Sequence, residues 1–387
     1  MRAPVLASCL FLAALLIGKA PAADSLNVRL IGGCGLPSEA YDLGMSMNYA
    51  YVADGDSGLR VVSVVDPTQP AEVGYCDTPG WARGVAVSGY YVYVADYDSG
   101  LRVISVADPA HPMVVGHCDT PGRALGVTVS GSYAYVADGD SGLRVISVAD
   151  PAHPTEVGFC GTSFPANAVT VAGNYAYMAD DRGGLLVVSV ADPANPATVG
   201  GYAIIGASAL GVTVNGDYAY VAFSDSGLHI FRVSDPTHLL HLGQCGDYRW
   251  VWDVALSGGN AYLATDEAGL RVISVADPAH PVEVGHYDMP GWANGVTVSG
   301  GYVYVAYGDR GLQIFQYYGV GVEESPKPQA PSRNSVATVI RRLPEGATAF
   351  DALGRRVLNP KAGICFVRQA SAAERGASAV SKVVVTR

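Results

Sequence analysis

The chain has 387 residues, of which 49% are hydrophobic and only 15% are charged, and its formal net charge is −11. Ordinary globular domains carry about 25% charged residues, so much of this chain lies where charge is unfavourable, and a disordered chain is excluded. No apolar run reaches the roughly 20 residues that span a bilayer, so we expect no transmembrane segment, and the negative charge argues against nucleic acid as a partner.

The first 23 residues have the organisation of a secretory signal peptide. Arg2 precedes an apolar stretch at residues 5–17, and the small residues 20–22 follow it as in a cleavage site. Cys9 completes a motif like that of lipoproteins, but it lies inside the apolar stretch instead of after it. We therefore expect residues 1–23 to direct export, and we expect the mature protein to be extracellular or at the cell surface.

A repeat of about 42 residues follows the leader. Seven Gly-Leu dipeptides follow one another at steps of 42 or 43 residues. Each copy contains four β-like segments separated by turn-forming residues. Four short strands in such a unit predict a β-propeller blade, whereas the frequent Pro and Gly exclude a helical solenoid. The Gly-Leu pairs begin at Gly58, Gly100, Gly142, Gly184, Gly227, Gly269 and Gly311.

The two ends of the repeat region complement each other. The last copy ends on its third strand, at residues 312–318, while residues 28–34 resemble a fourth strand. The N-terminal strand can therefore complete the last blade and close the ring without an exposed edge. We predict an all-β fold in which residues 24–320 form a seven-bladed β-propeller closed by its N-terminal strand.

The repeat motif resembles a known family. The sequence Leu-Arg-Val-Ile-Ser-Val-Ala-Asp-Pro, with Val-Gly and Tyr-Val-Tyr-Val-Ala-Asp, resembles the LVIVD-repeat proteins over about residues 26–318. These are bacterial and archaeal surface or secreted β-propellers, and members generally lack an assigned reaction. The resemblance therefore implies architecture more than chemistry. The family usually has Asp where this chain has Ser63, Ser105, Ser147 and Ser274.

A Pro-rich linker, residues 321–334, precedes a C-terminal tail at residues 335–387. Proline-rich linkers are stiff and extended. Segments 349–357, 363–368 and 382–387 resemble a C-terminal sorting domain, although Cys365 stands where that family usually has Tyr. The resemblance implies a small Ig-like β-sandwich that engages the type IX secretion machinery or directs the protein to the cell surface.

The charge is divided between the propeller region and the tail. Residues 24–325 hold 11 arginines, no lysine and 32 Asp or Glu residues, a net charge of −21, whereas residues 326–387 have a net charge of +8. A partner of the propeller should therefore tolerate or prefer a negative surface.

Several sequence motifs resemble those of catalytic or metal sites. Residues 55–58 and 139–142 read Gly-Asp-Ser-Gly, as around a serine-protease nucleophile, but no His recurs nearby to act as the base. The Asp-x-Asp pairs that begin at Asp54, Asp96 and Asp138 could supply part of a Ca²⁺ cage. Because several copies lack these carboxylates and no bidentate Glu follows, we interpret them as turns. We predict no metal and no cofactor, with Ca²⁺ as the alternative.

The histidines and cysteines are also interpreted as structural. His238 and His241 are the one close His pair, and we interpret them as part of a turn. Five cysteines share one position in the fourth strand, where neighbouring blades lie too far apart for a disulfide. We predict buried free thiols that act as small hydrophobic groups. They are Cys34, Cys76, Cys118, Cys160 and Cys245.

The loops are predicted to separate onto two faces of the ring. Uniform Asp-Pro turns share one face, whereas the turns between the second and third strands share the other with the connections between blades. These connections vary, and they carry all four Trp residues of the chain. Their side chains should surround the mouth of the central channel, and variable loops often carry function. The candidate ligand-binding residues are Tyr41, Trp81, Arg83, Arg123, Trp250, Trp252 and Trp292.

Three functional hypotheses remain open. The preferred one is a secreted or surface-displayed propeller that binds a protein or glycan through the Trp-bearing face, although Trp81 and Trp292 could instead cap the space between blades. The second is an extracellular hydrolase or lyase, for which no acid–base pair is assigned. The third is a structural surface-layer component that self-assembles. Polar residues available to an enzyme are Glu39, Asp42, Arg83, Arg123, Asp247 and Asp253.

Overall fold

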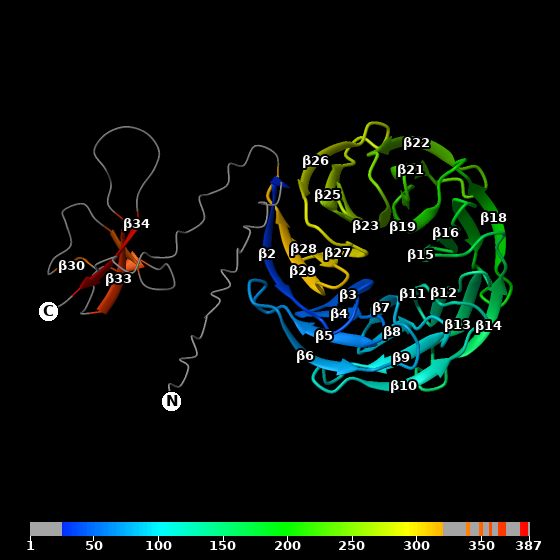
Figure 1. Cartoon of the computed structure of the whole chain (residues 1–387), viewed down its shortest axis with the longest axis horizontal. Coiled ribbons are helices and arrows are strands. Elements are labelled where there is room, and N and C mark those ends of the chain that lie inside the picture. Colours follow the sequence, from blue (N-terminus) through cyan, green and yellow to red (C-terminus); the bar gives the residue numbers. More distant parts are fainter. Residues whose placement is uncertain are drawn as a thin grey trace, which may run out of the picture. The chain divides into compact units, whose positions relative to one another are not determined.

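The computed structural model describes residues 25–319 and, in the C-terminal part, the backbone of five strands. The chain divides into two units, Met1–Val322 and Glu323–Arg387. In the first unit, seven antiparallel sheets follow one another in a ring (Figure 1), the arrangement of a β-propeller around its central channel. Within the described residues every regular element is a strand, and none of them contains a helix able to cross a membrane.

Each sheet is a blade whose first strand lines the channel and whose fourth strand lies on the outside (Figure 1). The first strands of blades 1 to 7 are β3 (Asp42–Ser46), β7 (Gly84–Ser88), β11 (Gly126–Ser130), β15 (Ala168–Ala172), β19 (Ala209–Asn215), β23 (Val251–Ser257) and β27 (Gly295–Ser299). The second strands are β4 (Tyr49–Ala53), β8 (Tyr91–Ala95), β12 (Tyr133–Ala137), β16 (Tyr175–Ala179), β20 (Tyr218–Phe223), β24 (Asn260–Thr265) and β28 (Tyr302–Ala306).

The third and fourth strands complete each blade. The third strands are β5 (Leu59–Ser63), β9 (Leu101–Ser105), β13 (Leu143–Ser147), β17 (Leu185–Ser189), β21 (Gly227–Arg232), β25 (Gly269–Ser274) and β29 (Leu312–Tyr317). The fourth strands are β6 (Ala71–Cys76), β10 (Met113–Cys118), β14 (Thr155–Cys160), β18 (Ala197–Tyr202), β22 (Leu240–Cys245), β26 (Val282–Tyr287) and, in blade 7, β2 (Val28–Cys34).

The hydrophobic core lies between the blades. One cluster joins Tyr51 and Val61 of blade 1 to Val85, Val94 and Ile104 of blade 2, and similar clusters fill the other gaps. The second strands are buried on both sides, because each sheet is covered by its two neighbours. This arrangement explains the low fraction of charged residues.

The N-terminal segment closes the ring, as predicted. Strand β2 pairs antiparallel with β29, from Val28 opposite Tyr317 to Cys34 opposite Leu312. A two-residue strand that the sequence did not predict, β1 (Ser25–Leu26), pairs with β26 of blade 6. Between them, Asn27 adopts a left-handed φ of 55°, and its Nδ2 donates a hydrogen bond to the Val284 carbonyl over 2.8 Å. The segment therefore joins blades 6 and 7.

The prediction of buried free thiols is correct only in part. All five equivalent cysteines of the propeller are free thiols, but they are half-buried instead of fully buried. Burial raises the pKa of Cys118, for example, so the thiol form is favoured there. The difference arises because the outermost strand has no further strand beyond it.

The second unit contains a five-stranded sheet in the order β30-β34-β33-β31-β32. Its strands are β30 (Thr338–Ile340), β31 (Thr348–Phe350), β32 (Arg356–Val357), β33 (Gly363–Arg368) and β34 (Val380–Val385). The predicted signal peptide, the predicted linker and the remainder of the tail lie outside the described residues. The leader, the linker and the Ig-like sandwich therefore stay predictions.

Candidate functional site

Each inner strand begins with a β-bulge at the mouth of the channel. In blade 1, the amide of Tyr41 donates to the Ala53 carbonyl over 2.9 Å, although Asp42 is already the register partner of Ala53. Two residues thus oppose one, which defines a bulge and redirects a side chain. All seven bulge residues line one cavity of about 460 Å³. They are Tyr41, Arg83, Leu125, Asn167, Leu210, Trp252 and Asn294.

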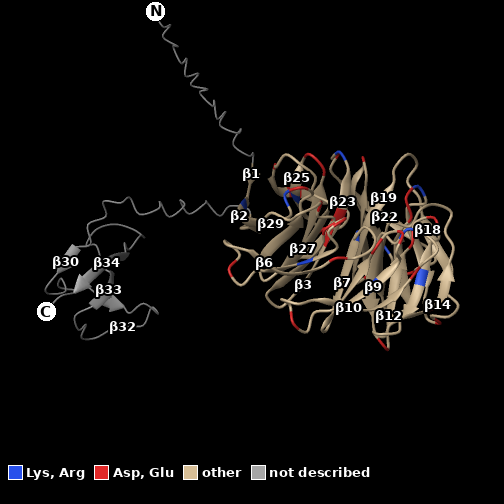
Figure 2. Cartoon of the chain, turned by 60° about the horizontal axis from the view of Figure 1, so that its bottom comes forward, with Lys and Arg blue, Asp and Glu red and all other residues tan. Residues whose placement is uncertain are grey.

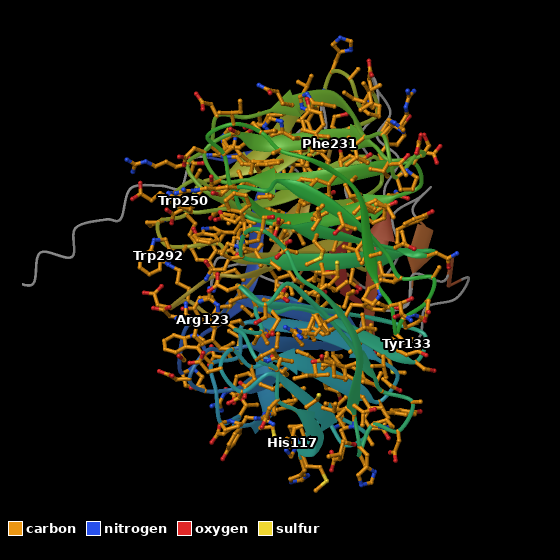
Figure 3. The ribbon with its side chains drawn as sticks, turned by 90° about the vertical axis from the view of Figure 1, so that its right-hand side faces the viewer. His117, Arg123, Tyr133, Phe231, Trp250 and Trp292 are labelled. Carbon is orange, nitrogen blue, oxygen red and sulfur yellow. The ribbon has the colours of Figure 1, made fainter. Side chains whose placement is uncertain are left out.

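The wall of this cavity is strongly asymmetric. Blades 3, 4 and 5 contribute only their bulge residues, two leucines and an asparagine. Blades 6, 7, 1 and 2 contribute aromatic and charged side chains, which we call the aromatic arc. Trp250 and Trp292 lie on the same face of the ring as Arg123, opposite to Tyr133 (Figure 3). The aromatic arc consists of Glu39, Tyr41, Arg83, Trp250, Trp252, Asp266 and Trp292.

Two tryptophans form a stacked pair in the arc. The rings of Trp250 and Trp252 lie 5.5 Å apart at an interplanar angle of 18°. Trp250 has a left-handed φ of 50° and an exposed fraction of 42%. A bulky residue with this backbone conformation stores about 1–3 kcal/mol of strain, which concentrates at functional sites.

On the other side of the arc, Tyr41 is held by three neighbours. Its hydroxyl donates to Glu39 Oε2 over 2.5 Å, and the Arg83 guanidinium lies 4.1 Å from the centre of its ring. The Trp81 ring packs beside it with 6.1 Å between ring centres. Burial and the hydrogen bond to Glu39 raise the pKa of Tyr41 to about 12. Tyr41 is therefore a neutral donor at physiological pH.

Two carboxylates occupy the channel wall immediately after the bulge, where the other five blades have Gly or Ala. Asp42 accepts hydrogen bonds from the amides of Leu43 and Val85, at 2.7 and 2.8 Å. Asp253 makes the equivalent pair of bonds, one of them to the amide of Val296 in the next blade. Burial and the neighbouring charge of Asp253 raise the pKa of Asp42 to about 7. Burial also raises the pKa of Asp253.

The structure brings five of the seven candidate residues to the cavity: Tyr41, Arg83, Trp250, Trp252 and Trp292. Trp81 lies beside Tyr41, with 6.1 Å between the ring centres, and does not line the cavity. Arg123 is outside the cavity, 4.0 Å from Asp98. Sequence reasoning missed Asp266, which takes the position of Gly55 and Gly139 in other copies. Asp181 takes the same position in blade 4 without lining the cavity, so the repeat pattern alone carries no signal that selects Asp266.

The polar residues considered for an enzyme do not converge on one centre. Glu39 and Arg83 line the cavity, and Asp42 and Asp253 lie on the channel wall. Asp247 lines a different cavity, beside Asp225 and Gln244.

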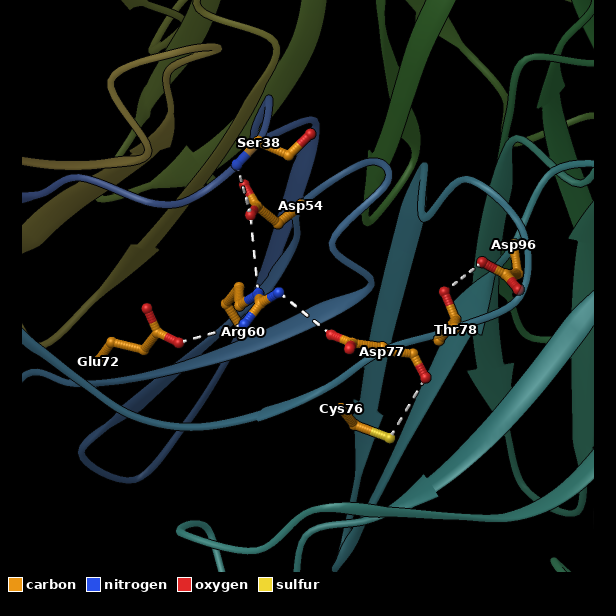
Figure 4. A network of polar contacts seen from close by, with 8 residues as sticks. All are labelled: Ser38, Asp54, Arg60, Glu72, Cys76, Asp77, Thr78 and Asp96. Carbon is orange, nitrogen blue, oxygen red and sulfur yellow. Dashed lines mark hydrogen bonds and ion pairs between the residues drawn. The ribbon is translucent and has the colours of Figure 1, made fainter.

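The Asp-x-Asp turns serve as structural clamps (Figure 4). Asp96 is fully buried, and it accepts hydrogen bonds from the Thr78 hydroxyl over 2.6 Å and from the Gly80 amide over 2.9 Å. Arg102 approaches the same carboxylate to 3.6 Å. These bonds hold the connection between β6 and β7, which carries Arg83 into the cavity. Within the described part of the chain, no cluster of three His, Cys, Asp or Glu side chains could hold a metal ion.

The His pair found in the sequence separates in the structure. His238 lies in its turn and contacts Asp235, with 3.1 Å between Nδ1 and Oδ2. His241 lies on β22, where its Nε2 is 3.0 Å from Nδ1 of His229. The turn interpretation is therefore wrong for His241. Burial lowers the pKa of His229 to about 4, so this His229–His241 contact is neutral at physiological pH.

Comparisons with known proteins agree with this architecture. A family model described as LVIVD repeat matches residues 37–78, 79–120, 121–162, 165–204, 206–247, 249–289 and 290–315. The WD40 repeats of RRP9 align with a TM-score of 0.60 at 14% identity, covering 77% of this chain and 100% of that one. BamB from Moraxella catarrhalis aligns with a TM-score of 0.55 at 10% identity, covering 75% and 98%. At these identities the likeness concerns the fold alone. No curated protein matches the chain.

Proposed function

Because the chain belongs to the LVIVD-repeat family and forms a seven-bladed propeller scaffold, we propose that it is an extracellular binding protein that holds a protein or glycan ligand at the mouth of its channel. One observation carries this proposal. Seven equivalent bulges aim one side chain each into a cavity of about 460 Å³, and the side chains of one sector are aromatic and charged.

The dimensions and chemistry of the cavity support a binding role. Ligand sites typically enclose about 300–1,000 Å³ and combine aromatic walls with a few polar groups. Trp, Tyr and Arg are also the residues that dominate binding energies at protein interfaces. The scaffold imposes no requirement for them, because other blades have Leu or Asn at the bulge position.

The proposed location outside the cell rests on the sequence of both ends of the chain. Residues 1–23 resemble a signal peptide, and residues 335–387 resemble a sorting domain. We expect the full-length protein to reach the medium or the cell surface, and removal of residues 335–387 to retain it inside the envelope. Immunodetection in cell fractions checks this, and an unchanged distribution would contradict it.

A ligand screen followed by a paired mutant comparison tests the binding role. The full-length protein is applied to glycan and peptide arrays, and the affinity for each captured ligand is measured by calorimetry. The double variant Trp250→Ala/Trp252→Ala should lose at least about tenfold in affinity, since such aromatic contacts contribute more than 1 kcal/mol.

The control variant is Tyr90→Ala. This tyrosine is 66% exposed and lies in the hairpin turn before β8, on the opposite face of the ring. The affinity of this variant for the captured ligand should stay within about twofold of that of the parent protein. Full affinity in a correctly folded tryptophan double variant would refute the site.

A further inference from the structure

We propose that the cavity accepts a basic side chain, arginine or lysine, presented by a protein partner. This inference rests on the proposed binding function and narrows its ligand from a protein or glycan to a protein segment that carries a positive charge.

The first argument is the balance of charge at the cavity. Two carboxylates, Glu39 and Asp266, line it together with a single cation, Arg83. The guanidinium of Arg83 is already placed over the Tyr41 ring at 4.1 Å. The site therefore carries an excess of negative charge, within a propeller region whose net charge is −21.

The second argument concerns Asp266, which forms no ion pair among the described residues. Its Oδ1 is buried and has no hydrogen-bond partner among the described residues. Arg249 acts on Asp266 only through its charge, since its guanidinium pairs with Glu267 at 3.5 Å. A buried carboxylate oxygen without a donor is unfavourable. A positively charged group from a ligand would supply the missing donor and the missing charge.

The third argument is the aromatic wall around these carboxylates. A guanidinium or ammonium group is attracted to the face of an aromatic ring, and most strongly to tryptophan. Trp250 and Trp292 are 42% and 54% exposed, so their rings are accessible from the solvent. The contact between Arg83 and Tyr41 shows that this arc already stabilises one guanidinium in this way.

Other ligand classes fit the site less well. An anionic ligand would meet the carboxylates of Glu39 and Asp266. A neutral sugar could stack on the tryptophans, but it would leave the charge of Asp266 uncompensated. The basic side chain is the ligand that satisfies both features together.

Intrinsic fluorescence tests the inference on the full-length protein, because all four tryptophans of the chain lie on this face. The probes are the blocked peptide Gly-Gly-Arg-Gly-Gly, its lysine counterpart, and a counterpart with citrulline, which has nearly the shape of arginine but no charge. A neutral cello-oligosaccharide represents glycans. We expect a saturable response to the arginine and lysine peptides, and at least about tenfold weaker binding of the citrulline peptide.

The matched variants are Asp266→Asn and Glu267→Gln, which remove one negative charge each from adjacent residues. Only Asp266 lines the cavity. We expect Asp266→Asn to lower the affinity for the arginine peptide by about tenfold. Glu267→Gln should lower the same affinity by less than about twofold. Equal losses in the two variants would show general electrostatic attraction and would overturn the inference.

Three other results would also overturn it: equal binding of the citrulline and arginine peptides, no saturable response to either basic peptide up to about 10 mM, or binding of the oligosaccharide alone. If the oligosaccharide or an array ligand loses its affinity in the Trp250→Ala/Trp252→Ala variant, the proposed function still holds and only the basic side chain is rejected. If no ligand depends on those tryptophans, both fail.

Discussion

Buried aspartates in the turns fix the connections that form the cavity. Asp54, Asp96 and Asp138 are fully buried, and each accepts a hydrogen bond from the connection leading into its own blade. An arginine of the third strand lies 3.5–3.8 Å from each carboxylate. Aspartates that resemble part of a calcium motif in the sequence therefore hold in place the connections that form the cavity.

Loss of one such bond should destabilise the protein measurably. In Thr120→Val, the buried carboxylate of Asp138 loses the donor at 2.5 Å, and the free energy of unfolding should fall by about 1–3 kcal/mol. Thr237→Val, which removes an exposed hydroxyl that donates to Asp235, should cost less than about 0.5 kcal/mol. Urea denaturation compares the two variants. Equal losses of unfolding free energy would contradict the stabilising role of the buried Thr120–Asp138 hydrogen bond.

The carboxylates of the channel should make stability depend on pH. Asp42 has a pKa of about 7 in the folded protein, above its ordinary value of 3.8, because it is buried near the charge of Asp253. The folded state therefore binds the proton of Asp42 more tightly than the unfolded state does. The contribution of this group to the free energy of unfolding is complete below pH 3.8 and is lost as the pH rises through 7.

In Asp42→Asn, the free energy of unfolding should therefore fall less steeply between pH 5 and pH 8 than in the parent protein. Chemical denaturation at several pH values measures the slope. The exposed turn residue Asp56 provides the control variant Asp56→Asn, which should keep the slope of the parent. An unchanged slope in the Asp42 variant would contradict the raised pKa.

At the scale of single elements, the outer strands explain why glycine recurs in the repeat. Gly158 lies at a bulge in β14, and a Cβ atom there would come within 2.3 Å of the Pro193 carbonyl of the next blade. In blade 6 the equivalent Gly285 faces the Leu26 carbonyl of β1 instead. Strand β1 thus takes the place of the Asp-Pro turn that the interrupted blade 7 lacks.

Alanine at this glycine should push neighbouring blades apart. We expect Gly158→Ala to lower the free energy of unfolding by about 1–3 kcal/mol, as overpacking does. Gly161→Ala is the control, because a Cβ atom there would meet open space, and its effect should stay within about 0.5 kcal/mol. Thermal and urea unfolding compare the two variants. A Gly158 variant as stable as the parent protein would contradict the prediction, because neighbouring blades would then accept the extra methyl group without cost.

The elements differ in how far the sequence predicts them. Seven blades and closure by residues 28–34 follow from the period and from counting strands. Strand β1 could not be predicted, since two residues carry no periodic signal and their pairing depends on β26 being nearby. The inner bulges were also missed, because a bulge depends on register with the adjacent strand and not on residue type.

At the scale of the whole molecule, charge lies mainly in the loops at the ends of the blades, while the strands are largely uncharged (Figure 2). Breaks in the sequence repeat located the face of the ring on which the cavity lies, and five residues of its lining. They could not distinguish Trp81 and Arg123 from the lining residues, because position in a loop does not determine the direction of a side chain. They also gave no reason to select Asp266, whose importance depends on the groups that surround it.

Hydrogen–deuterium exchange of the full-length protein, with and without a saturating array-selected ligand, tests most directly whether the channel mouth is the binding site. Our account predicts slower exchange in residues 39–41, 81–83, 250–252 and 292–294, with no change in the Asp-Pro turns such as residues 66–70. Protection of those turns or of the outer strands, with unchanged exchange at the mouth, would contradict it.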